Sequence, residues 1–276
     1  MRVQSWFPWN GSKRWLLPDL LEITNRWEAG GSYIEPFVGG GSIARAIRMQ
    51  HPRAHQILGD ANPWLMSVYE WQRMGVPYVL PENFSDLRYW RGLQDADIPD
   101  LTVTNRATRF AVCLLTAWGN RWETLADGEF KSTANQAWCA PEYLRSRLVQ
   151  FFGTAGWLEP SDECAVGDWA STAARAQPGD LLYLDPPYTE TLGYGNQTWT
   201  LSNQLDVVDL AIEKAKAGVA VVVSNHSTIE RLYRRAGFEI KIIGGQKAMK
   251  TRRTRDEMLA RSGLAETDWW MPWDIR

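Results

Sequence analysis

Cysteine, histidine and long apolar runs are scarce in this sequence of 276 residues. Only 3 cysteines and 3 histidines are present, and the cysteines form no Cys-x-x-Cys motif. We therefore expect buried, reduced thiols, with neither a disulfide framework nor a zinc site. No stretch reaches the roughly 20 apolar residues of a membrane span. None near the N-terminus has the character of a signal peptide, so we expect a cytoplasmic location.

An excess of charge of either sign is also missing. The chain carries 30 Lys and Arg against 32 Asp and Glu, a formal net charge of −2. This balance excludes binding of a polyanion by bulk charge alone, but it allows a localised basic face. With 45% hydrophobic and 22% charged residues, the composition excludes wholesale disorder. The unusual feature is 16 Trp, many beside polar residues, which suits either a core or stacking on a planar ligand.

Strand and helix signals alternate in both flanks of the sequence. Apolar runs predict strands, and helical periodicity predicts helices between them, with Ser42 and Asn62 as the expected N-caps of the first two. The expected strands are 32–37, 56–60, 180–185, 219–224 and 238–243, and the expected helices are 43–47, the segment after 62–63, 203–217 and 229–236. This order predicts an α/β, Rossmann-like fold, a mostly parallel sheet with helices on both faces.

The periodicity weakens in the middle of the chain, which is richer in Pro, Asn, Arg and Trp. Helical stretches are expected there at 105–118 and 141–152, on either side of a polar, turn-rich segment. We therefore predict one domain made of residues 1–74 and 156–276, interrupted by a mainly helical insert of residues 75–155.

A glycine loop, Phe37-Val38-Gly39-Gly40-Gly41, stands where a predicted strand turns into a helix. Glycines there let a ligand approach the backbone, and the helix N-terminus presents unpaired N–H groups. Asp60 lies 19 residues past Gly41, at the end of the next strand, where a carboxylate can bind ribose hydroxyls. The pair favours an adenosine-type cofactor. An ordinary tight turn, a capping acid and a dinucleotide fingerprint, Gly39-x-Gly41-x-x-Ala44, remain alternatives.

The tetrapeptide Asp185-Pro186-Pro187-Tyr188 ends a predicted buried strand. Because prolines have no N–H, the loop offers acceptors, the Asp185 carboxylate and the Pro186 carbonyl, beside an aromatic ring. Two acceptors can hold both hydrogens of an exocyclic amine and free its lone pair for attack, while Tyr188 stacks on the base. A rigid surface turn would need neither the apolar strand before it nor the ring after it.

These motifs resemble those of the Dam-type (D12 class) S-adenosylmethionine-dependent DNA adenine-N6 methyltransferases. The resemblance rests on the segment 35–41, on Asp185-Pro186-Pro187-Tyr188, on Pro8-Trp9-Asn10-Gly11-Ser12-Lys13 and on Ser224-Asn225-His226. It implies a class I methyltransferase fold in a bacterial cell or phage-infected host. It also implies direct methyl transfer from S-adenosylmethionine to adenine N6 in duplex DNA, with S-adenosylhomocysteine as product and no metal.

The resemblance also implies a role for each matching residue. Asp185, Pro186, Pro187 and Tyr188 would be catalytic. The cofactor would contact Trp9, Lys13, Glu35, Phe37, Gly39, Gly41, Asp60, Asp168 and Asp185. Within this set Lys13 would lie near the methionine carboxylate, Asp60 at the ribose and Asp168 at the adenine amine. Alternatives stay open for three of them, since Asp168 can cap a helix, Trp9 can be core and Lys13 can be solvated.

Double-stranded DNA is the implied partner of a monomer or weak dimer. The target base must then be flipped out of the helix. Phosphate contacts are expected from the basic segment 247–255, which contains Lys247, Lys250, Arg252, Arg253 and Arg255. Base contacts are expected from Asn120, Arg121 and Trp122, a segment similar to the family's recognition hairpin. Here an arginine directly follows the asparagine and Thr124 occupies the later position, so the family's best-known target, GATC, cannot be assumed.

Rival functions remain open at this stage. The glycine loop alone also suits a nicotinamide-dependent oxidoreductase, which would leave the tetrapeptide unexplained. Other amino-methyltransferases act on cytosine N4, RNA adenine or protein glutamine, but they more often have Ser or Asn in place of Asp185. A DNA-binding module without catalysis would not need Asp185 and Lys13. A zinc-dependent base deaminase is excluded, because its His-x-Glu and Pro-Cys-x-x-Cys motifs are missing.

The basic segment yields a prediction about salt. If all five of its cations neutralise phosphates, the logarithm of DNA affinity should fall against the logarithm of salt concentration with a slope of about −4.5. A fourfold rise in salt would then weaken binding on the order of a few hundred-fold. Fluorescence anisotropy with a labelled duplex measures this slope. A slope near zero would show that the segment is a solvated surface and not a DNA contact.

Overall fold

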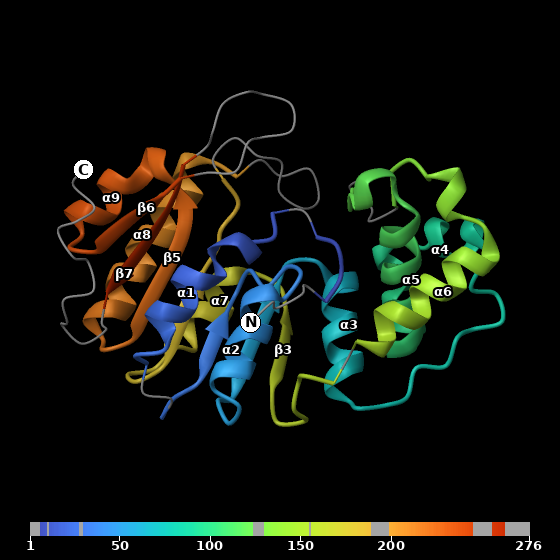
Figure 1. Ribbon diagram of the computed structural model, residues 1–276, viewed down its shortest axis with the longest axis horizontal. Helices are drawn as coiled ribbons and strands as arrows, with labels where there is room; N and C mark the ends of the chain where they lie inside the picture. Colours follow the sequence, from blue (N-terminus) through green and yellow to red (C-terminus); the bar gives the residue numbers. More distant parts are fainter. Residues whose placement is uncertain are drawn as a thin grey trace.

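The computed structural model describes residues 6–9, 11–27, 30–123, 130–154, 156–188, 199–244 and 256–262. Its centre is a seven-stranded sheet in the order β3-β2-β1-β4-β5-β7-β6 (Figure 1). Neighbours among the first five strands are parallel, and β7 runs antiparallel between β5 and β6. The strands are β1 (Tyr33–Glu35), β2 (Gln56–Asp60), β3 (Glu163–Val166), β4 (Leu181–Leu184), β5 (Ala220–His226), β6 (Glu239–Ile243) and β7 (Glu257–Ser262).

Helices cover both faces of the sheet, as predicted. Successive strand residues point to opposite faces, so Leu181 and Tyr183 join one buried cluster while Leu182 and Leu184 join another. The first cluster is completed by α1 (Leu17–Thr24), α2 (Ser42–Gln50) and α3 (Pro63–Arg73). The second is completed by α7 (Trp169–Ala174), α8 (Leu201–Lys216) and α9 (Glu230–Arg235). The α/β, Rossmann-like prediction is therefore confirmed.

Three further helices group beside α3, at the β3 end of the sheet (Figure 1). They are α4 (Leu87–Gly92), α5 (Val103–Thr116) and α6 (Pro141–Gly153), and α5 packs on α3, α4 and α6. The N-terminal segment reaches them, since Phe7 stacks on Phe151 with ring centroids 5.2 Å apart. The boundaries of the predicted insert, 75–155, stay a prediction.

Several element ends differ from the prediction for local reasons. Gly41, and not Ser42, is the N-cap of α2, because its left-handed backbone (φ +65°) lets the helix begin at Ser42. β1 ends at Glu35, since Pro36 has no N–H for the ladder. α8 begins at Leu201, where Thr200 forms a capping box with Asn203. The sequence did not predict β3, β7 or α4.

The predicted N-cap of α3 is confirmed, whereas the three cysteines are buried to different degrees. Asn62 caps α3, its Oδ1 accepting the N–H groups of Trp64 and Leu65 at 3.0 and 3.1 Å. The three cysteines are free thiols, but only Cys113 is fully buried, whereas Cys139 and Cys164 are partly exposed. Among the described residues, no helix is both long enough and apolar enough to cross a membrane.

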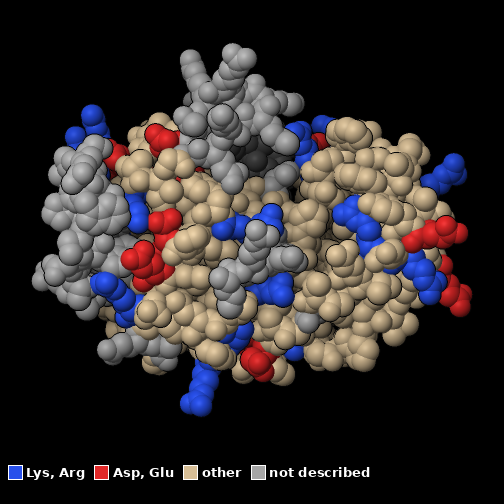
Figure 2. All heavy atoms as spheres, viewed as in Figure 1, with Lys and Arg blue, Asp and Glu red and all other residues tan. Residues whose placement is uncertain are grey.

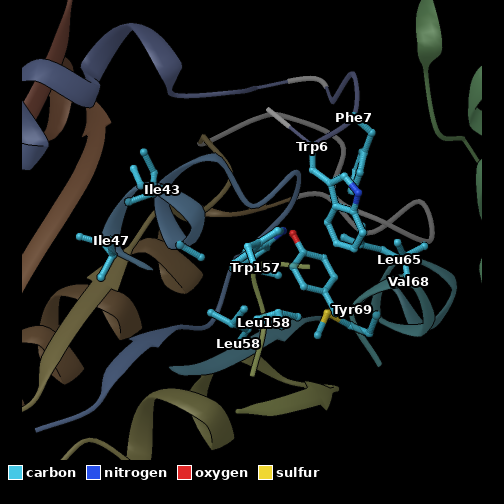
Figure 3. Close-up of a cluster of buried hydrophobic side chains, with 14 of the residues drawn as sticks. Trp6, Phe7, Ile43, Ile47, Leu58, Leu65, Val68, Tyr69, Trp157 and Leu158 are labelled. Atoms are coloured by element: carbon cyan, nitrogen blue, oxygen red, sulfur yellow. The ribbon is translucent and has the colours of Figure 1, made fainter. Parts of the chain in front are cut away.

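The buried tryptophans among the described residues belong to the hydrophobic core. Trp6, Trp27, Trp64, Trp71, Trp90 and Trp157 are all at most 9% exposed. Figure 3 shows Trp6 and Trp157 beside Tyr69, whose ring meets both edge-on at centroid distances of 5.4 and 6.2 Å. Tyr69 donates its hydroxyl to the Gly39 carbonyl at 2.7 Å. This aromatic cluster therefore contacts the glycine loop through the Tyr69 hydroxyl.

The loop generates a prediction with an internal control. Gly41 and Gly75 share a left-handed backbone (φ +65° and +64°), but a Cβ on Gly41 would lie 2.5 Å from the Tyr69 hydroxyl, whereas one on Gly75 meets nothing within 4 Å. We expect Gly75→Ala to cost about 1 kcal/mol of unfolding free energy through backbone strain. Gly41→Ala should cost about 1–3 kcal/mol more through overpacking. Urea denaturation measures both, and equal losses would contradict the steric role of Tyr69.

Candidate active site

The glycine loop, Asp60 and the Asp185 loop lie at one edge of the sheet. The parallel strands β1, β2 and β4 end there, so the glycine loop after β1, Asp60 at the end of β2 and Asp185 after β4 lie at the same edge. β1 and β4 are neighbours, and the sheet continues to β2 on one side and to β5 on the other. A crevice at such a switch point is the usual ligand site of open α/β sheets.

Asp185 is held in a fixed orientation by two donors. Lys13 Nζ lies 2.6 Å from its Oδ1, and the Ser224 hydroxyl donates to the same oxygen at 2.8 Å. Ser224 is itself 2.8 Å from the buried Tyr183 hydroxyl. Within the described part of the chain, Oδ2 accepts no hydrogen bond. The Asp185 side chain is 17% exposed. One oxygen is therefore tied to the protein, and the other remains as an acceptor.

Glu257 is a site residue that the sequence analysis missed. It opens β7, and its Oε1 accepts the Tyr188 hydroxyl and lies 3.5 Å from Lys13 Nζ. Lys13 Nζ also lies 5.0 Å from the centroid of the Tyr188 ring. The only sequence signal was the acidic pair Asp256-Glu257 before the apolar run Met258-Leu259-Ala260, too weak to identify the strand or its place.

The charges of this cluster stabilise one another despite burial. Burial opposes the charge on Lys13, but Asp185, Tyr188 and Glu257 outweigh it and raise the pKa of Lys13 above its ordinary value. Burial likewise raises the pKa of Glu257, and Lys13 and the Tyr188 hydroxyl offset that rise only in part. Lys13 is therefore a permanent cation that compensates two acidic side chains.

Asp60 joins the glycine loop to the end of β2. Its Oδ2 accepts the Gly39 N–H at 3.1 Å and its Oδ1 accepts the Asn62 N–H at 3.0 Å. Burial raises the pKa of Asp60 to about 6, although these N–H groups and that of Ala61 lower it. At neutral pH the carboxylate is therefore ionised, and its two known bonds leave acceptor capacity for a ligand.

Trp9 lies directly on the glycine loop. A Cβ on Gly39 would come within 2.7 Å of its Nε1, and one on Gly40 within 2.8 Å of its Cβ. Its ring also packs against Phe110 of α5 at a centroid distance of 5.8 Å. The glycines thus make room for Trp9, which connects the loop to the helices beside α3.

An aromatic wall and an exposed acid lie on the other side of the loop. Phe37 stacks on Trp169 with centroids 5.6 Å apart, and Trp199 meets the Phe37 ring edge-on at 5.8 Å. Asp168 precedes α7 and is exposed, and its side chain makes no capping hydrogen bond. Val166, which pairs with Asp60 in the sheet, is 59% exposed. Asp168 therefore occupies the N-cap position of α7, as the alternative expected, but without a capping hydrogen bond from its side chain.

Glu35 lies beneath the loop and contacts the protein. It is 2% exposed, and it accepts the Tyr33 hydroxyl at 2.7 Å and the Ala44 N–H of α2. Burial is the main reason that the pKa of Glu35 is well above its ordinary value. A direct contact with a cofactor stays a prediction for Glu35.

The predicted DNA contacts occupy different environments. Asn120 (φ +51°) donates its side-chain amide to the Leu114 carbonyl at 3.0 Å, and Arg121 is exposed. Trp122 is half-buried and stacks on Phe110 at 4.8 Å, whereas Trp118 is 67% exposed. Lys247, Lys250, Arg252, Arg253 and Arg255 lie outside the described residues. On the face in Figure 2, basic and acidic side chains are interspersed over the described surface.

Comparisons with known proteins agree with this geometry. Residues 9–89 match the family described as D12 class N6 adenine-specific DNA methyltransferase. A DNA adenine methylase of Vibrio cholerae is 25% identical, over 94% of this chain and 96% of its own. A type II methyltransferase of Lactococcus lactis, M1.LlaDCHI, is 24% identical over 82% and 83%. A DNA N-6-adenine-methyltransferase of Escherichia phage P1 is 24% identical over 89% of this chain but 33% of its own length.

The cluster around Lys13 predicts a pH-dependent effect on stability. In Lys13→Met, Glu257 loses the cation that partly offsets its burial, so its folded-state pKa rises further above the unfolded one. The folded protein then binds more protons, and its stability falls as pH rises. We expect a deficit of about 3 kcal/mol at pH 8 that shrinks towards pH 5. Urea denaturation at both pH values measures it.

Lys214→Met is the matched control. Lys214 is also 8% exposed, but it donates to the carbonyls of Ala174 and Ala176, which do not titrate. Its deficit should be the same at both pH values. A deficit of Lys13→Met that does not shrink at acidic pH would contradict the assigned charge pairing.

Proposed function

We propose that this chain, which is similar to the D12 class of N6 adenine-specific DNA methyltransferases, transfers a methyl group from S-adenosylmethionine to N6 of an adenine flipped out of duplex DNA. The observation that carries this proposal is the Asp185 carboxylate, fixed by Lys13 and Ser224 at the carboxyl end of β4 beside the glycine loop. Its second oxygen can accept a hydrogen bond from the target amine.

The residues at this edge suit an adenosine-containing cofactor. The ionised Asp60 can accept the ribose hydroxyls, and the exposed Asp168 can accept the adenine amine at the end of β3. Phe37 and Val166 offer apolar surface near them. S-adenosylmethionine supplies an electrophilic methyl group when bound. Because Lys13 is paired with Asp185, we assign it to the catalytic carboxylate as well as to the edge of the cofactor pocket.

The tetrapeptide activates the amine. Asp185 Oδ2 and the Pro186 carbonyl accept its two hydrogens, which draws the nitrogen lone pair out of conjugation with the ring. The carboxylate also stabilises the positive charge that develops on nitrogen during direct transfer. Pro187 stiffens the turn, and the Tyr188 ring stacks on the base. These residues orient and polarise the amine and form no covalent intermediate.

DNA binding completes the proposal. Flipping the target base costs a few kcal/mol, which contacts to the duplex must offset. We assign base reading to Arg121 and Asn120 and phosphate contacts to the basic segment 247–255. Trp118 and not Trp122 is the exposed ring of its segment, so we assign the wedge between bases to Trp118. The helices α4, α5 and α6 would form the recognition lobe.

Asp185→Ala tests the mechanism. It removes the charged acceptor, so we expect methyl transfer to DNA to fall by about 1,000-fold or more, while duplex binding stays largely intact. Incorporation of labelled methyl groups and gel-shift titration measure the two properties. Asp209→Ala changes an exposed acid of α8 and should leave both unaltered. Undiminished transfer by Asp185→Ala would contradict the mechanism.

A further inference from the structure

The Tyr188 ring is held from three elements that are far apart in the sequence. Its hydroxyl donates to Glu257 on β7, Lys13 Nζ lies 5.0 Å from its centroid, and the His226 ring at the end of β5 meets it edge-on at 6.2 Å. The hydroxyl is the atom farthest from the backbone. A hydrogen bond there fixes the tilt of the ring plane, which the backbone of residues 185–188 alone leaves free.

Glu257 is a rigid anchor for this hydrogen bond. β7 lies between two strands, and Glu257 pairs with His226 of β5 on one side and with Ile243 of β6 on the other. The residue is only 4% exposed. Since β7 runs antiparallel to β5, its first residue falls at the edge where β4 and β5 end. The direction of this one strand therefore brings an acid from the end of the sequence to the catalytic loop.

Glu257 also contacts Lys13, whose positive charge it helps to balance, but this contact is longer than the one between Lys13 and Asp185. Lys13 Nζ is 2.6 Å from Asp185 and 3.5 Å from Glu257, so Asp185 is its closer partner. The Tyr188 hydroxyl and Lys13 share the same Glu257 oxygen, Oε1, and the hydroxyl is the nearer of the two. The hydrogen bond to Tyr188 is therefore the closer of the two contacts of the Glu257 carboxylate.

From this geometry we infer that Glu257 is a positioning residue for the methylated base, acting through the Tyr188 hydroxyl. This inference rests on the proposed adenine methylation. A ring held at one tilt presents a flat surface to the flipped base and keeps its amine between the two acceptors of the tetrapeptide. The interaction serves the turnover step, so its loss lowers the turnover rate and leaves cofactor affinity unchanged.

A double-mutant cycle tests the inference. Tyr188→Phe keeps the ring and removes only the hydroxyl, and Glu257→Leu removes the acceptor. We expect each to lower the single-turnover rate by about 10- to 100-fold, the effect of losing a hydrogen bond to a charged group. The double variant should be no slower than the slower single variant, because both changes remove the same interaction. The dissociation constant for S-adenosylmethionine, measured by calorimetry, should stay within about twofold of the wild-type value.

Two further variants separate positioning from mere folding. Glu257→Gln keeps an oxygen that accepts the hydroxyl, so its rate should lie between those of the wild type and Glu257→Leu. Glu239→Leu removes the acceptor of the hydrogen bond between Glu239 of β6 and Arg261 of β7, 2.6 Å long, at the far end of the same hairpin. It loosens β7 without touching Tyr188 and should transfer methyl groups at the wild-type rate.

Three results would contradict a positioning role for Glu257. Multiplying losses in the double variant, a Tyr188→Phe rate equal to wild type, or an equal loss in Glu239→Leu would overturn the inference. Tyr188→Phe keeps the ring and Glu257 and removes only the hydroxyl, so the test stands even if Glu257→Leu does not fold. A wild-type protein without transfer to adenine would refute the proposed function instead, whereas an active wild type with an unaffected Tyr188→Phe refutes only the role of Glu257.

Discussion

The contact between Lys13 and Asp185 is the interaction on which the site depends. It joins a residue near the N-terminus to a strand end 172 positions later, and it places a cation beside a carboxylate where the two side chains are only 8% and 17% exposed. Burial opposes the charge of any group in such surroundings, and a neighbouring group of opposite charge offsets that cost. Lys13 supplies this compensation to Asp185 and occupies one of its carboxylate oxygens, which leaves Oδ2 as the acceptor that the proposed mechanism uses.

The sheet supplies the remaining constraint. Its parallel strands bring the glycine loop, Asp60 and Asp185 to one edge, and the antiparallel β7 adds Glu257 from the opposite chain direction. Several acids therefore gather at one place, and each is accommodated differently. Glu35 bonds to Tyr33 and to the start of α2, Asp60 accepts backbone N–H groups, and Asp185 and Glu257 share Lys13. Stability and catalysis are served by the same polar contacts.

The sequence predicted the parts of the site whose chemistry is local. The glycine loop, the position of Asp60 and the tetrapeptide at 185–188 are short motifs, and alternation of strands and helices was enough to predict their common edge. The partners of Asp185 and Tyr188 were not predictable in this way. Contacts of Ser224 and Glu257 depend on strand order and on the direction of β7, which no local pattern encodes. Likewise, periodicity does not distinguish the exposed Trp118 from the stacked Trp122, because tertiary packing determines which of the two rings is buried.

The most direct test of the account is the identity of the methylated nucleoside. Duplex DNA incubated with the protein and S-adenosylmethionine should be digested to nucleosides and analysed by mass spectrometry, in parallel with the Asp185→Ala variant. The account predicts N6-methyldeoxyadenosine with the wild-type protein and none above background with the variant. Methylation of cytosine N4, or the absence of any methylated base with the wild type, would contradict it.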